Sequence, residues 1–280
     1  MIRISHLRRY HALAMLAGVL VAGAGLGAHD LWIEPSAFVA GAERPIAVRL
    51  RVGANLLGDP VARDPALIER FVAVDSTGTR PIPGPDGVDP AGVLRITAPG
   101  VVVIGYASKP TPIVIAAQKF NDYLVEEGLD AVIALRRTRN ETQAAAHEEF
   151  SRCAKALVLS GPRQKAGDRA LGFTLELIAE QNPYALSRGQ PLTVRLLYKA
   201  KPLAGALVVA MNKRDPAQKL SARSAKDGRV SFALKDPGMW LIKAVHMTPA
   251  ASGSSAEWTS FWASLTFELG GGAAVAPGQK

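Results

Sequence analysis

Two stretches near the end of the chain, WLIKAVHM at residues 240–247 and WTSFWASLTFE at residues 258–268, carry the clearest strand signal. In both, apolar residues recur at every second position, which is the period of a β-strand. In the second stretch this period places Trp258 and Trp262 on one face, and Phe261 begins an apolar row on the other. Because a sandwich strand has one core face, another part of the chain should cover the two tryptophans. We therefore expect both to be buried.

The rest of residues 170–268 shows the same alternation in short segments separated by turn signals, such as Asp227-Gly228. The additional predicted strands are residues 173–179, 192–198, 206–212, 220–224 and 229–234. Short strands at nearly even spacing predict a β-sandwich of immunoglobulin or transthyretin type. The polar residues 161–169 contain Gly and Pro and predict a link to the preceding domain, and residues 269–280 predict a disordered tail.

Residues 29–160 predict a second β domain that is interrupted by helices. Alternation is clear from Pro45, and short apolar runs continue to about residue 116 between turn-rich segments. The period then becomes helical, in residues 118–127, 129–136 and 142–159. We therefore expect a mainly β protein with two sandwich-like domains and a helical insert at about residues 117–159.

The first 28 residues predict a secretory signal peptide. A basic start precedes an apolar run from Ala12 to about Ala24, which is too short for a bilayer span and is followed by small residues. Cleavage after Ala24 fits the small-residue rule best. Cleavage after Gly27 also fits. Cleavage after Ala28 would make His29 the first residue, but it places Leu26, a poor residue for this position, three residues before the cut. We expect a periplasmic protein, and the sequence leaves these cleavage sites open.

The composition and the motifs that the sequence lacks argue against several classes of function. The formal net charge of +9 is spread along the chain, and nucleic acid is not an expected partner for an exported protein. The single cysteine, Cys153, excludes an internal disulfide and lies on the apolar stripe of the third predicted helix, so we expect it to be packed rather than nucleophilic. The sequence has no P-loop, GxSxG, HExxH or CxxC motif, and we expect a binding protein rather than an enzyme.

His29 is the strongest candidate ligand for a metal. Asp30 follows it directly, Glu34 is near, and Trp32 lies between the two carboxylates. An imidazole with a carboxylate, and the α-amine if cleavage frees it, suits Ni(II), Co(II), Cu(II) or Zn(II). The alternative is a histidine that only forms structural hydrogen bonds at a domain edge.

His246 is the second candidate ligand. It ends its predicted strand just before a loop of small residues, and we expect it to meet His29 across a junction lined by Trp258 and Trp262. The alternative is a structural histidine at the rim of the sandwich. His147 is interpreted as a surface residue.

Arg152 and Lys155 lie on the third predicted helix, with Glu148 four residues before Arg152. This spacing favours a solvated helix face with surface ion pairs. The alternative is that the two cations form a patch for an anionic ligand.

Four segments resemble one bacterial family: AHDLWIEP (28–35), KFNDYLVEEGLD (119–130), FSRCAKALV (150–158) and GMWLIKAVHM with WTSFWASLTFE. This exported family has no known function, and its members are often described as periplasmic components of cobalt or nickel uptake systems. The resemblance implies a β-sandwich fold, ligand histidines matching His29 and His246, and a nickel or cobalt cargo for a membrane transporter or outer-membrane receptor. The rival interpretation is an exported carrier or interaction protein for an anionic or sugar ligand, with structural histidines.

Overall fold

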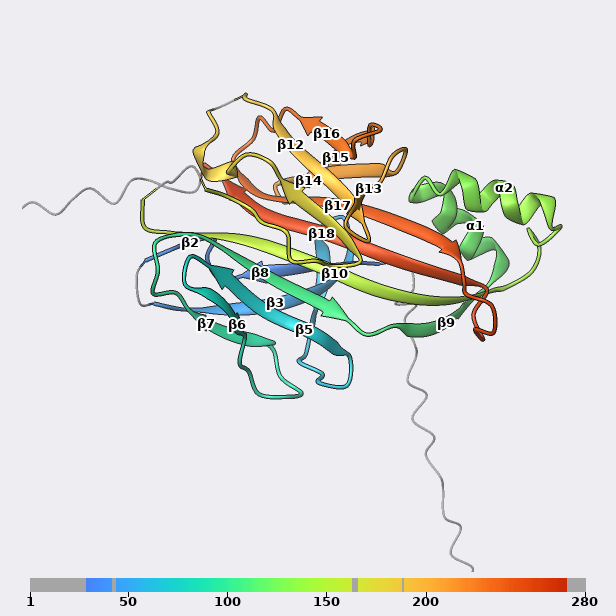
Figure 1. Ribbon diagram of the computed structural model, residues 1–280, viewed down its shortest axis with the longest axis horizontal. Helices are drawn as coiled ribbons and strands as arrows, with labels where there is room; N and C mark the ends of the chain where they lie inside the picture. Colours follow the sequence, from blue (N-terminus) through green and yellow to red (C-terminus); the bar gives the residue numbers. More distant parts are fainter. Residues whose placement is uncertain (1–28, 42–43, 163–165, 188, 271–280) are drawn as a thin grey trace, which may run out of the picture.

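The computed structural model of the protein describes residues 29–41, 44–162, 166–187 and 189–270 (Figure 1). The protein is mainly β, as the sequence predicts, and its strands form sheets that stack in layers. The predicted signal peptide and residues 271–280 of the predicted tail lie outside the described residues. Within the described ranges, none of the helices has the length and apolar character needed to cross a membrane.

A ten-stranded central sheet is the middle layer. Its strands are β2 (Val39–Ala40), β5 (Ile68–Asp75), β6 (Gly78–Pro81), β8 (Gly100–Ser108), β9 (Thr111–Ile115), β10 (Ala146–Ser160), β14 (Leu207–Asn212), β15 (Asp215–Arg223), β17 (Gly238–Pro249) and β18 (Trp258–Leu269). The strand order is β15-β14-β17-β18-β10-β8-β5-β6, and β2 and β9 also pair with β10. The central sheet thus contains strands from both halves of the chain.

Two smaller sheets cover the central sheet on opposite faces. The N-terminal sheet contains β1 (Asp30–Pro35), β3 (Pro45–Ala54), β4 (Leu57–Val61) and β7 (Gly92–Arg95). The C-terminal sheet contains β11 (Leu175–Ala179), β12 (Leu192–Tyr198), β13 (Lys201–Pro202) and β16 (Arg229–Phe232), and a short 3-10 helix, η2 (Pro183–Ala185), follows β11. Each sheet closes its own apolar core against the central one, which gives the sandwich character.

The alternation of side chains along β10 and β18 separates the two cores. On β18, Leu265 and Phe267 face the C-terminal sheet. On β10, Ala156 and Val158 face the N-terminal sheet, whereas Leu157 between them faces the C-terminal sheet. Successive residues of one strand therefore belong to different cores, as the pleat of a β-strand requires.

The two halves of the chain meet where β10 pairs in parallel with β18, from Glu148 opposite Trp258 to Ala156 opposite Thr266. The segments expected as separate sandwich domains, residues 29–160 and 170–268, thus share one sheet. All the strands predicted for residues 170–268 are present. The predicted link at 161–169 runs between β10 and β11, and its residues 163–165 lie outside the described part.

The third predicted helix, at residues 142–159, is wrong, because this segment forms β10. β10 lies inside the central sheet and is covered on both faces, so nearly all its residues from Phe150 to Ser160 are buried. A strand buried on both faces lacks the simple alternation of a half-exposed strand. The apolar residues of β10 matched a helical spacing for this reason.

The other two predicted helices are confirmed as α1 (Ala117–Glu126) and α2 (Asp130–Thr138). Phe120, Tyr123 and Leu124 form the buried stripe of α1. Gly128 follows the helix at a φ of 62°, a conformation that glycine adopts without steric cost. The helices lie at one end of the molecule against β17 and β18, where they enclose a third apolar cluster that contains Trp258 and Trp262 (Figure 1).

Candidate functional site

Side chains of the central sheet, rather than another strand, hold one edge of β1. The other edge of β1 pairs with β3. On the free edge, the main-chain oxygens of His29, Leu31 and Ile33 accept hydrogen bonds from the side chains of Arg152, Ser264 and Thr266, in that order. We call these three bonds the β1 ladder. Each bond pairs a carbonyl that would otherwise be buried without a partner, so the ladder fixes the position of β1 up to its first residue.

His29 lies directly before β1, at the end of the ladder. Its ring atom Nδ1 is buried and has no hydrogen-bond partner among the residues that the structure describes. A buried polar atom without a partner carries an uncompensated desolvation cost, and such an atom in a native fold calls for an explanation. The unpaired nitrogen has its lone pair or its proton available for a ligand.

Lys243 of β17 forms a buried ion-pair cluster beside this point. Its Nζ atom lies 2.9 Å from Asp30 Oδ1 and 2.6 Å from Glu127 Oε1. Burial alone would lower the pKa of Lys243, but the two carboxylates outweigh it and raise that pKa above its usual range. Burial raises the pKa of Glu127 to about 7, although Lys243 opposes this shift. Lys243 thus remains a fixed cation that joins β1 to the end of α1.

Two stacked aromatic rings lie between this cluster and a second buried carboxyl group. Trp262 stacks on Tyr123 of α1 with ring centres 5.2 Å apart, and Lys243 Nζ lies 5.9 Å from the centre of the Trp262 ring. Behind this pair, Glu148 accepts hydrogen bonds from Tyr123 and Ser260. Burial raises the pKa of Glu148 to about 7. The described part of this region therefore has two carboxyl groups, Glu127 and Glu148, that titrate near neutrality.

The expected burial of Trp258 and Trp262 is confirmed, with exposed fractions of 0 and 4 %. The covering segment is α1 rather than the stretch around His29. Phe120 and Tyr123 of α1 contact Trp258 and Trp262, respectively. The stretch that begins at His29 covers a later part of β18, through the ladder bonds from Ser264 and Thr266.

His246 does not join this cluster. It lies three residues beyond Lys243 on β17, and an odd spacing on a strand places two side chains on opposite faces. Its ring packs against Tyr198 of the C-terminal sheet, with ring centres 4.5 Å apart. Burial, with a contribution from Lys199, lowers the pKa of His246. The predicted site shared by His29 and His246 is therefore wrong in this arrangement, because β17 separates them.

The carboxylates predicted as further ligands already have partners. Asp30 pairs with Lys243, as described above. Glu34 accepts a hydrogen bond from the indole of Trp32 and forms an ion pair with Lys213 at 2.5 Å. Within the described ranges, no group of three or more His, Cys, Asp or Glu side chains is arranged to hold a metal ion.

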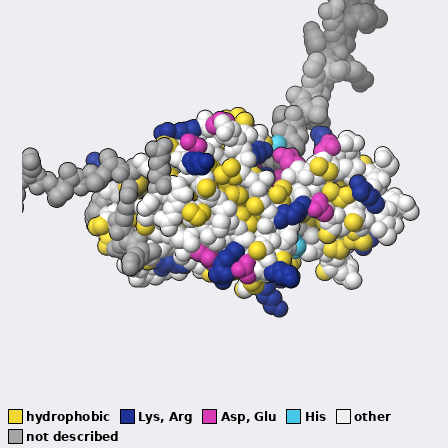
Figure 2. Space-filling model, turned by 90° about the horizontal axis from the view of Figure 1, so that it is seen from above, with side chains coloured by type: hydrophobic (Ala, Val, Ile, Leu, Met, Phe, Trp, Pro, Cys, Tyr) yellow, Lys and Arg dark blue, Asp and Glu magenta, His cyan; other side chains and the backbone are white. Residues whose placement is uncertain are grey.

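Both interpretations of Arg152 and Lys155 are wrong: the two side chains form neither a solvated helix face, which the sequence favours, nor the alternative anion patch. Both side chains are buried, with exposed fractions of 5 and 1 %, and their odd spacing on β10 directs them to opposite faces. Arg152 contacts His29 and lies over Trp262, whereas Lys155 pairs with Asp168 and Glu176. On the face shown in Figure 2, Lys and Arg side chains lie scattered with Asp and Glu among them.

Sequence reasoning missed the charged residues that build the cluster, namely Lys243, Glu127 and Glu148. A signal for one of them exists in the sequence. Lys243 interrupts the apolar stretch WLIKAVHM, and a lysine inside a strand that is buried on both faces requires a buried carboxylate partner. The partners themselves come from distant segments and could not be identified by spacing.

Comparison with known proteins identifies a family and no activity. Residues 26–248 match the family described as "Domain of unknown function (DUF4198)". No curated protein matches. Among solved structures, the D0-D1 domain of intimin is 15 % identical and aligns over 85 % of this chain and 97 % of that chain, with a TM-score of 0.20. Dimeric latent PorU from Porphyromonas gingivalis is 12 % identical over 87 % of this chain and 21 % of that chain, with a TM-score of 0.18.

Proposed function

Because the chain belongs to the DUF4198 family, whose description assigns no activity, we propose a function from its own residues: it binds a divalent transition metal ion at His29. The observation that carries this proposal is the buried, unpartnered Nδ1 atom of His29. A metal ion would give this nitrogen the partner that the described residues around it do not supply. Nickel or cobalt is the proposed cargo, and copper and zinc accept the same donor atoms.

Removal of the leader after Ala28 would complete the donor set. The α-amine of His29 and its Nδ1 then belong to one residue and can bind one ion together in a single chelate ring. The β1 ladder supports this role, because it holds the main chain of His29 in place before any ligand arrives. A ligand residue that is already held loses less conformational entropy on binding.

We further propose that the protein is exported to the periplasm and acts without catalysis. It would carry the metal ion to a membrane transporter or an outer-membrane receptor. The predicted leader supports export, and the absence of a recognisable nucleophile and base in the sequence supports a binding role. The rival proposal is an anionic or sugar ligand. Arg152 and Lys155 do not support it, because both side chains are buried.

Titration calorimetry with Ni(II) and Co(II) tests the proposal on the mature protein, after its first residue has been identified by mass spectrometry. We expect His29→Ala to weaken binding by at least about tenfold, since it removes the ring donor. His246→Ala is the matched control and should leave affinity within about threefold, because His246 lies on the other face of β17. A variant with one extra alanine before His29 tests the amine. Unchanged affinity in His29→Ala would overturn the proposal.

A further inference from the structure

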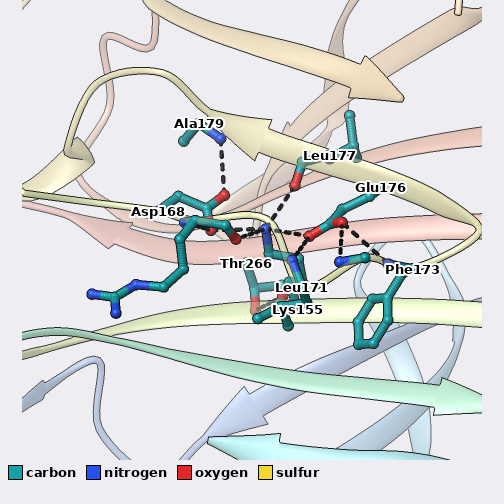
Figure 3. A network of polar contacts seen from close by, with 10 residues as sticks. Lys155, Asp168, Leu171, Phe173, Glu176, Leu177, Ala179 and Thr266 are labelled. Atoms are coloured by element: carbon teal, nitrogen blue, oxygen red, sulfur yellow. Dashed lines mark hydrogen bonds and ion pairs between the residues drawn. The ribbon is translucent and has the colours of Figure 1, made fainter. Parts of the chain in front are cut away.

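A second buried charge cluster lies on the other face of β10, between the central and C-terminal sheets (Figure 3). Lys155 Nζ is 2.8 Å from Asp168 Oδ1 and 3.1 Å from Glu176 Oε1. The exposed fractions of the three side chains are 1, 0 and 2 %, in that order. The cluster therefore places an amine and two carboxyl groups in direct contact, away from solvent.

Main-chain groups hold both carboxyl groups in fixed orientations. Glu176 accepts hydrogen bonds from the N–H groups of Leu171, Gly172 and Phe173 at 2.6, 2.9 and 3.2 Å. Asp168 accepts from the N–H of Ala179 through Oδ2 and from that of Arg169 through Oδ1. Figure 3 shows the Lys155 ammonium group between the two carboxyl groups, and the dashed lines from the main-chain N–H groups end on the carboxyl oxygens. Three donors thus hold the Glu176 carboxyl group in place, and each Asp168 oxygen has its own donor.

The charges of this cluster do not balance. One ammonium group faces two carboxyl groups, and the Lys155 ammonium also lies within hydrogen-bond distance of the main-chain oxygens of Arg169 and Leu177. Keeping ions out of water is costly, and that cost falls if an ion pair becomes a neutral group. Burial raises the pKa of Asp168 above its usual range, which favours the uncharged acid needed as an electrophile.

We propose that Lys155 and Asp168 condense to an intramolecular amide crosslink, with Glu176 as the catalytic base. The new bond joins Lys155 Nζ to Asp168 Cγ. The bond from Cγ to Oδ1 breaks, since Oδ1 is the oxygen next to the attacking nitrogen. The crosslink would tie β10 to the segment that leads into β11, and so fasten the connection between the two halves of the chain.

The protons and atoms of this step balance without another reactant. The ammonium group first gives one proton to Asp168 Oδ1, 2.8 Å away, which yields a neutral amine and an uncharged acid. The amine then attacks Cγ, and Glu176 takes a second proton from the nitrogen as the new bond forms. During attack, negative charge develops on Oδ2, where the Ala179 N–H at 2.9 Å stabilises it. Glu176 passes this proton to the protonated Oδ1, which leaves as water. No oxidation or reduction occurs, and Glu176 returns to its starting form.

The surroundings favour the product once it has formed. Leu171, Leu175 and Leu177 are buried members of the core that encloses the cluster. Solvent water is excluded from such a site, so the reverse reaction, hydrolysis of the amide, lacks its reactant. The condensation removes one positive and one negative charge and leaves Glu176 with its three main-chain donors.

Intact-mass measurement of the mature wild-type protein under denaturing conditions tests the proposal. We expect the mass to lie below the calculated mass by one water molecule, and a tryptic digest to contain a branched peptide joining Lys155 to Asp168. Lys155→Met should have its full calculated mass. Asp168→Asn should lose one ammonia molecule instead of water, because the leaving group changes, and this difference identifies the attacked carbon.

Glu176→Gln tests the base and should keep its full mass while remaining folded by circular dichroism. Loss of water in this variant would overturn the role of Glu176. If a variant does not fold, the mass of the wild-type protein and the branched peptide still show whether the Lys155–Asp168 crosslink has formed. A wild-type protein with its full calculated mass, cleaved normally by trypsin after Lys155, would overturn the crosslink and leave a buried ion pair.

Discussion

Arg152 of β10 donates a hydrogen bond to the main-chain oxygen of His29, and this bond is the first of the β1 ladder. The other two bonds, from Ser264 and Thr266, reach Leu31 and Ile33. In all three bonds a side chain donates to a main-chain oxygen, and only the first bond holds His29 itself. Variants of the three donors therefore distinguish an effect on the position of His29 from an effect on the stability of β1.

We predict that Arg152→Met lowers both metal affinity and stability, because it frees the His29 carbonyl itself. Ser264→Ala and Thr266→Val should each lower the free energy of unfolding by about 1–3 kcal/mol, the usual cost of leaving a buried carbonyl without its donor. These two variants should leave metal affinity within about threefold. Urea unfolding and titration calorimetry on all three variants check this. Equal losses of affinity in the three would show that the ladder acts on β1 as a whole.

Lys243→Met should destabilise the protein by about 3–5 kcal/mol, because it leaves Asp30 and Glu127 buried without their cation. The matched control is Lys213→Met. Lys213 also pairs with a carboxylate of β1, Glu34, but its side chain is 44 % exposed, and we expect a loss of about 1 kcal/mol or less. Urea unfolding measures both. Equal losses would contradict the buried cluster.

The free energy of unfolding should depend on pH because the buried carboxyl group of Glu148 titrates. Its pKa rises from 4.5 to about 7 on folding because of burial, so between these values the native state binds a proton that the unfolded chain releases. Stability must then fall as pH rises from about 4.5 to about 7, by about 3 kcal/mol in total.

Glu148→Gln should remove the part of this slope that Glu148 contributes, since a neutral amide replaces the protonated acid, and the part due to Glu127 should remain. Urea unfolding at about pH 5 and about pH 8 measures it. The exposed Glu126 on α1 supplies the control, and Glu126→Gln should leave the slope unchanged. A slope in Glu148→Gln as steep as that of the wild type would assign the titration to another group.

Cys153 should resist thiol reagents in the folded protein. Burial raises the pKa of its thiol to about 11, so the reactive thiolate is scarce at neutral pH and shielded from solvent. We expect labelling by an aromatic disulfide reagent to be at least roughly a hundredfold slower than for free cysteine, and to become fast in denaturant. Fast labelling of the native protein would show that β10 opens readily.

Some of the strands that the sequence predicts correctly are half-buried. On β12 and β16 one face packs against the core and the other is exposed or half-buried, and the alternation of apolar and polar residues follows this directly. β10 is different because both of its faces are covered. Its apolar run from Ala156 to Leu159, followed by Gly161-Pro162, is typical of such a strand, but the spacing of Glu148 and Arg152 resembled a helical pair.

The candidate site was only partly predictable from the sequence. His29 and the burial of Trp262 follow from local patterns. The alternation of β17 also placed His246 on the face of Trp240, which is correct. The sequence does not reveal which face of β17 receives β1, because that depends on Lys243 finding Asp30 more than two hundred residues away. The sequence therefore predicts that His29 and His246 share a metal site, whereas β17 lies between them in the structure.

The parallel pairing of β10 with β18 has a consequence for the order in which the protein folds. β10 belongs to the first half of the chain, yet β18, near the other end, covers its edge along Glu148 to Ala156. Contacts between such distant segments form slowly, because a long loop must close first. Until β18 arrives, β10 presents an open edge to any other strand nearby. The half of the protein that is made first thus stays vulnerable to mispairing until the half made last is present.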